Sequence, residues 1–155
     1  MYDKTITLFN RYDSQTGTVW YPHILTGVDL NTDRGAILKK YGPDSTDSAQ
    51  LHVRYHLRDG TKMIADSAGN ELEWLPPKEW VKQTNDALEK SITFSPDSFF
   101  WEGVWNGETV NDAEYTDRRY DGFYAYMNAK HDNVFLITSV GGPYTVIPHF
   151  EVLGK

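Results

Sequence analysis

Leu51-His52-Val53-Arg54-Tyr55-His56-Leu57-Arg58 is the stretch that decides the fold class. Its odd positions are apolar or aromatic and its even positions are basic or imidazole, which predicts a strand with one buried and one solvated face. Asp59-Gly60 follows at once and favours a tight hairpin turn before a second strand, Thr61 to Ala65. The centre of the chain is therefore expected to be β-structure.

The N-terminal region repeats this pattern. Thr5 to Tyr12 and Thr18 to Leu25 read as two strands, and the turn-forming residues Asp13 to Gly17 lie between them. This arrangement predicts a meander that begins at the N-terminus.

A second hairpin is expected at the C-terminus. Val134 to Val140 is rich in β-branched and aromatic residues, Gly141-Gly142-Pro143 interrupts it, and Tyr144 to Leu153 resumes. In the last strand Ile147, His149 and Glu151 share one face, and Pro148 indicates an edge or a bulge because it cannot donate to a ladder.

One helix is predicted over about residues 77–90, because Pro77 suits a first helical position and Trp80 and Leu88 form its apolar stripe. Phe99 to Trp105 is a further strand candidate. Residues 39–49 and 106–122 are polar and without periodicity, which predicts long loops. The expected fold is mainly β: a small antiparallel β-barrel or sandwich, in a single domain spanning 1–155, with one added helix.

Composition excludes several classes of protein. The chain has 155 residues, a formal net charge of −7 and no cysteine, so a DNA-neutralising basic face, disulfides and thiolate metal sites are not expected. No basic stretch followed by an apolar run opens the chain, and no segment approaches the length of a membrane span. These features predict a protein that stays inside the cell where it is made.

Two metal patterns are considered and set aside. His52 and His56 point the same way along one strand but would lie about 13 Å apart, too far to share an ion. Asp29 to Asp33 resembles the start of a calcium loop, but Arg34 and Lys40 stand where that loop needs glycine and glutamate. Phosphate-loop, nucleophile-elbow and dinucleotide motifs do not occur. We therefore expect no catalytic residue, no cofactor and no metal ligand.

Aromatic and acidic residues leave two alternatives open. Trp101 and Trp105 have the spacing of a sugar-stacking platform in a carbohydrate-binding β-domain, although the same spacing is typical of an ordinary core, which we favour. A cluster of carboxylates lies in the loop 106–122 and would be needed by a hydrolase, but a solvated or interface loop is the simpler interpretation.

The order of the segments resembles small virion proteins of tailed bacteriophages. The resemblance rests on Lys4 to Tyr12, on Trp20 to Val28, and on Val134 to Val140 followed by Pro148 to Lys155. It is closest to head–tail connector proteins of the stopper or head-completion type, and the helix 77–90 and the loop 106–122 make this chain longer than those proteins.

The resemblance implies a non-enzymatic structural subunit of the virion, assembled in the cytoplasm of the host bacterium. Such a protein forms a homo-oligomeric ring, typically of six copies, between the portal–adaptor complex and the tail proteins. DNA passes through its channel without specific binding, and no membrane is involved. Minor capsid and tail-completion roles remain alternatives.

Charged residues of the loop 106–122 are the candidate contacts between subunits, because opposite charges on such a loop can set the register between neighbours. The candidates are Glu108, Asp112, Glu114, Arg118 and Arg119.

Overall fold

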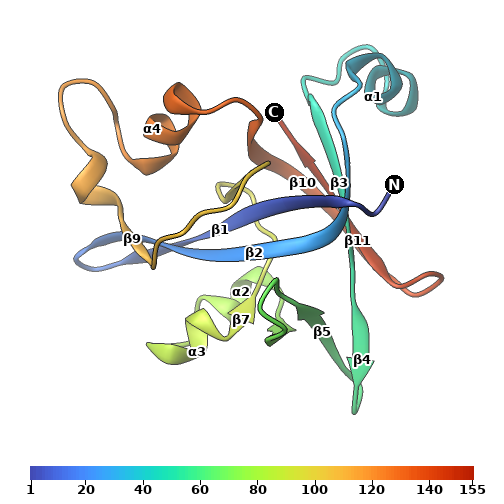
Figure 1. Cartoon of the computed structure of the whole chain (residues 1–155), viewed down its shortest axis with the longest axis horizontal. Helices are drawn as coiled ribbons and strands as arrows, with labels where there is room; N and C mark the ends of the chain where they lie inside the picture. Colours follow the sequence, from blue (N-terminus) through green and yellow to red (C-terminus); the bar gives the residue numbers. More distant parts are fainter.

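The strands of this protein form two sheets, which the computed structural model describes over residues 1–155. The larger sheet has seven strands in the order β1-β8-β10-β11-β3-β2-β9, and β1 also pairs with β2, which closes the sheet into a ring (Figure 1). Its strands are β1 (Lys4–Ser14), β2 (Gly17–Asn31), β3 (Ala49–Arg54), β8 (Phe99–Trp101), β9 (Val110–Asn111), β10 (Val134–Tyr144) and β11 (His149–Gly154). All pairings in this sheet are antiparallel, so the expected mainly β, antiparallel class is confirmed.

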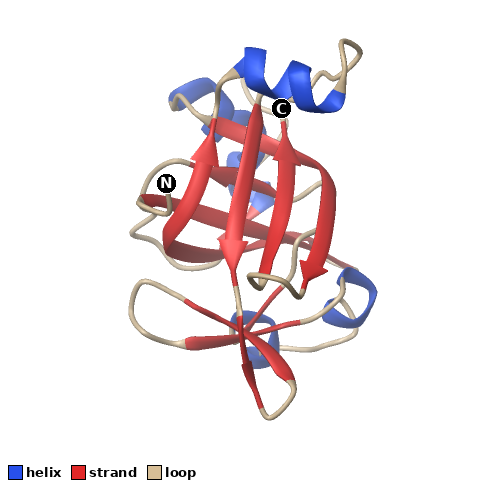
Figure 2. Cartoon of the chain, turned by 90° about the vertical axis from the view of Figure 1, so that its right-hand side faces the viewer, coloured by secondary structure: helices blue, strands red, loops and turns tan.

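The smaller sheet has four strands and lies at one end of the ring, with short helices beside it, while other helices lie at the opposite end (Figure 2). Its strands are β4 (His56–Arg58), β5 (Thr61–Ala65), β6 (Glu71–Trp74) and β7 (Ser91–Ile92). The deciding stretch 51–58 thus contributes to both sheets, since β3 ends at Arg54 and β4 starts after Tyr55. Asp59 and Gly60 form the predicted turn, both with positive φ, as a two-residue hairpin of this kind requires.

Two groups of buried side chains hold the fold together. The larger one consists mostly of side chains from the ring, such as Leu8, Leu51 and Phe150, and is joined by residues of the smaller sheet such as Ile64. The smaller one is aromatic-rich, includes Phe9, and is covered by α4 (Phe123–Lys130). Successive strand residues face opposite sides, which is why Leu8 and its neighbour Phe9 belong to different groups.

The predicted helix over 77–90 is two short helices, α2 (Pro77–Trp80) and α3 (Asp86–Glu89). Gln83 ends the first by donating from Nε2 to the Trp80 carbonyl, at 3.2 Å, and to Ser91 Oγ, at 2.8 Å. Asn85 then redirects the chain with a φ of 54°. Three further helices form where none was predicted: α1 (Arg34–Tyr41), α4 and the 3-10 helix η1 (Asp112–Tyr115). None of the helices has the length and apolarity needed to span a bilayer.

Two strand boundaries also differ from expectation. The strand predicted over 99–105 ends at Trp101, because Thr7 Oγ1 donates to the Gly103 carbonyl and accepts from the Trp105 amide, which curls the chain. In the C-terminal hairpin, Gly141-Gly142-Pro143 does not break the strand. It forms an irregularity within β10, and the turn lies at 145–148.

Candidate functional site

A row of polar residues crosses three strands of the ring. Asp29 on β2 lies opposite His52 on β3, and His52 lies opposite Glu151 on β11. Directly paired residues of antiparallel strands project from the same face of the sheet, so the three side chains are neighbours. His149, two positions before Glu151, joins them on this face.

The atoms of this row lie close enough to act on one another. His52 Nδ1 lies 3.5 Å from Asp29 Oδ2, and His52 Nε2 lies 3.6 Å from Glu151 Oε2. One ligand atom from each of His52, His149 and Glu151 lies within 4.8 Å of the other two. We call these three residues the His52 cluster.

Neighbouring side chains fix the orientation of Glu151. Its Oε1 accepts from Gln50 Nε2 at 2.9 Å and from Lys40 Nζ, at the end of α1, at 3.3 Å. Gln50 Nε2 also lies 3.1 Å from the Tyr41 hydroxyl, so α1 and β3 together hold this part of the site.

Burial lowers the pKa of His52 below its usual value. The carboxylate of Asp29 opposes this shift, whereas His149 and Lys40 add to it. A lowered pKa favours the neutral imidazole, which is the form that can accept a proton or a metal ion.

The tip of the β10–β11 hairpin is the second notable feature. Val146 and Ile147 are 82% and 69% exposed, and Tyr144 beside them is also exposed. Ile147 has a φ of 49°, a conformation that β-branched residues rarely adopt. Tyr55 anchors the hairpin by donating from its hydroxyl to the Tyr144 carbonyl at 2.7 Å.

The five residues predicted as subunit contacts lie on or next to the segment 108–119 but differ in their surroundings. Glu108, Glu114, Arg118 and Arg119 are exposed, and none forms an ion pair within the chain. Asp112 instead faces inward. Its Oδ1 accepts from Trp20 Nε1 and from the Phe123 amide, both at 2.9 Å.

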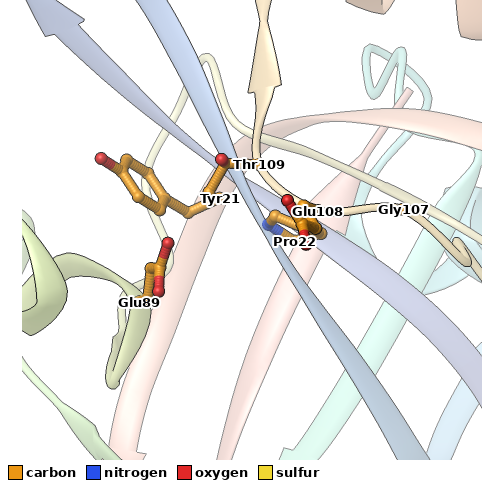
Figure 3. A pocket seen from close by; sticks show the side chains of 6 residues that line it. All are labelled: Tyr21, Pro22, Glu89, Gly107, Glu108 and Thr109. Carbon is orange, nitrogen blue, oxygen red and sulfur yellow. The ribbon is translucent and has the colours of Figure 1, made fainter.

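A shallow pocket of about 400 Å³ lies between this loop and the ring (Figure 3). Glu89 extends toward the ring of Tyr21 on one side, and Glu108 lies beyond Pro22 on the other. Burial raises the pKa of the Tyr21 hydroxyl, and the negative charge of Glu89 adds to the shift. Both effects favour the protonated phenol.

Trp101 and Trp105 pack against the smaller core instead of forming a flat platform. Trp105 meets Phe9 edge-on, with ring centroids 5.8 Å apart, and Trp101 lies over His131 at 4.5 Å. This matches the core-packing interpretation that the sequence favoured.

The sequence pattern does not indicate the His52 cluster, because the spacing of His52 and His56 pairs two residues that lie in different sheets. His56 lies in the other sheet, where its Nε2 is 2.7 Å from Glu71 Oε2, while His52 meets residues almost 100 positions away. The alternation in the sequence indicates that His149 and Glu151 share one face of a strand. It does not indicate that β11 pairs with β3, which brings these two residues to His52.

These features define a mainly β protein with a closed ring of strands, a polar cluster on the ring and an exposed apolar hairpin tip. The chain belongs to a family of unknown function, DUF6751, whose model matches residues 1–155. Neither a curated protein nor a solved structure matches the chain.

Proposed function

We propose that this protein is a structural subunit of a tailed-bacteriophage particle, a non-enzymatic head–tail connector that assembles into a ring of identical copies. A minor capsid or tail-completion protein would use the same kind of contact between subunits. The features described below therefore support assembly from identical copies and do not distinguish between these positions in the virion.

The observation that carries the proposal is the apolar, strained tip of the β10–β11 hairpin. A left-handed conformation costs a residue such as Ile147 about 1–2 kcal/mol. Because the side chain is exposed, no burial of apolar surface within the chain offsets this cost. Asparagine or glycine would fit this position without that cost. An isoleucine there is explained if its side chain is buried against another molecule.

The position of the tip suits contact between copies. The tip and the loop 106–122 lie at opposite ends of the molecule, at the right and the left of Figure 1. The loop end offers the unpaired charges of Glu114, Arg118 and Arg119. Contact between two different surfaces is head-to-tail, and it yields a ring when the rotation between copies closes.

The test is the mass of the purified protein across a concentration series, measured by light scattering, with negative-stain images of the largest species. We expect rings, and we expect Arg118→Glu/Arg119→Glu to abolish them while the far-UV circular dichroism stays unchanged. A matched control, Lys78→Glu/Lys90→Glu, makes the same change in charge on α2 and after α3 and should leave the rings intact.

Incorporation into particles gives the second readout, because some subunits assemble only on a preformed partner. Wild-type protein should enter phage particles and the Arg118/Arg119 variant should not. A chain that is monomeric at every concentration, and whose variant is incorporated as well as the wild type, would contradict the proposal.

A further inference from the structure

We infer that the His52 cluster is a binding site for one zinc ion, ligated by His52, His149 and Glu151. The inference is independent of the proposed role in assembly. It rests on three ligand atoms that the sheet register already brings together.

The distances are close to those that zinc requires. Zinc bonds to imidazole nitrogen and carboxylate oxygen are about 2.0–2.2 Å long, which places two ligand atoms of a tetrahedral site about 3.4 Å apart. His52 Nε2 and Glu151 Oε2 lie 3.6 Å apart, and no pair in the cluster exceeds 4.8 Å. Because β3 and β11 are hydrogen-bonded neighbours inside the ring, small side-chain rotations complete the site.

Hydrogen bonds orient both imidazoles as they do in metal sites. His149 Nδ1 lies 2.7 Å from the Ile147 carbonyl, which can only accept, so Nδ1 carries the proton and Nε2 keeps its lone pair. His52 directs Nδ1 toward the Asp29 carboxylate and Nε2 toward Glu151. A carboxylate behind a ligating histidine is a recurrent support of zinc sites.

The remaining neighbours leave one oxygen of Glu151 free. Gln50 and Lys40 occupy Oε1, and Oε2 faces the histidines. Gln50 Nε2 also lies 3.2 Å from His52 Nε2, so an ion would displace it from the histidine but not from Oε1. Lys40 contacts Glu151, and Arg54 lies opposite His149 in the pairing of β3 with β11, so both cations oppose binding by repulsion.

The ligand chemistry favours zinc over the hard cations. Calcium and magnesium take sets of oxygen ligands, whereas two imidazoles and one carboxylate are a zinc set that leaves the fourth position to water. An ion here would join β3 to β11 directly beneath the hairpin tip that carries Val146 and Ile147.

The experiment is calorimetric titration of the full chain, freed of metal with a chelator, with zinc chloride. We expect saturation at one ion per chain, a rise in Tm on loading, and tetrahedral absorption bands when cobalt replaces zinc. Glu151→Gln keeps a side chain that can still meet Gln50 and His149→Ala removes an accessible ligand, and each should weaken binding at least tenfold.

The matched control is His56→Ala, which removes a histidine that also contacts a glutamate but has no third ligand. Its affinity should stay within twofold of the wild type. Absence of saturable binding, or equal losses in His56→Ala and His149→Ala, would overturn the inference. Lys40→Ala should tighten binding if the site is as assigned, because it removes one of the opposing charges.

Discussion

His23 is a buried histidine whose environment ties folding to pH. It lies on β2, is 5% exposed, and its Nε2 has no hydrogen-bond partner. Burial lowers its pKa to about 4, although the backbone of Ser91 and the charge of Asp66 oppose the shift. In the unfolded chain a histidine titrates near pH 6.5.

Because its pKa is lower in the folded state, His23 should destabilise the protein in acid. Its contribution is fully present above pH 6.5 and is lost as the pH falls toward 4, since only the unfolded state binds the proton in that window. The loss amounts to about 3 kcal/mol between pH 7 and pH 4.

Urea unfolding of wild type and His23→Leu at both pH values tests this prediction. The difference in unfolding free energy between the two proteins should shift by about 3 kcal/mol in favour of the variant at pH 4. His131→Gln, which changes an exposed histidine, is the control and should show no such shift. Equal pH dependence of wild type and His23→Leu would refute the assignment.

Ile147 should be a position where stability and assembly oppose each other. Ile147→Asn relieves the left-handed strain, so we expect the free energy of unfolding to rise by about 1 kcal/mol and the Tm by about 2–4 °C. The same change removes the apolar contact, so ring formation should weaken. Val146→Asn is the matched control: it also removes an exposed side chain, but without strain to relieve, and should not raise the Tm.

At the scale of elements, Asp112 holds η1 between β2 and the start of α4. Asp112→Ala leaves the buried Trp20 indole N–H and the Phe123 amide without their acceptor, at a cost of about 2 kcal/mol. Asp112→Asn keeps a carbonyl oxygen and should cost less than half of that. Chemical denaturation measures both, with Glu114→Ala as an exposed control expected to change stability by less than about 0.5 kcal/mol.

Only part of the fold could be predicted from the sequence, because some elements depend on contacts with distant residues. Local hairpins could be predicted, because the alternation of apolar and polar residues and turn residues such as Asp59-Gly60 determine a hairpin within about ten positions. The end of α2 within the range 77–90 could not be predicted. It depends on the Gln83 side chain, which bonds to the Trp80 carbonyl and to Ser91 in β7. The opposite charges of its loop predict Asp112 as a subunit contact, and that prediction stays open. The sequence could not show its partners within the chain, Trp20 and Phe123, because they come from other elements.

The candidate zinc site shows the same limit at a larger sequence separation. Each ligand lies in a segment whose strand character was predicted, but only the register between β3 and β11 brings His52 opposite Glu151. That register is set by closure of the ring and by the core beneath it, which includes Leu51 and Phe150 on the other face. The alternation in a sequence predicts which residues share one face of a strand, but it does not predict which strands pair.

At the scale of the whole molecule, the two ends differ in chemistry: an apolar tip at one and a charged loop at the other (Figure 1). A head-to-tail interface uses both ends of every copy, whereas a two-fold interface uses the same surface twice. The two arrangements can be separated by disabling one end at a time and mixing the products.

Val146→Asp/Ile147→Asn disables the tip, and Arg118→Glu/Arg119→Glu disables the loop. Each variant alone should be monomeric, but each keeps the end that the other lacks. Mixed in equal amounts, they should form a heterodimer and stop there, since the two ends left free in that pair are the disabled ones. Native mass spectrometry with one variant isotope-labelled would distinguish this heterodimer from homodimers. A mixture that remains monomeric, while the wild type forms rings, would show that the tip and the loop do not contact each other.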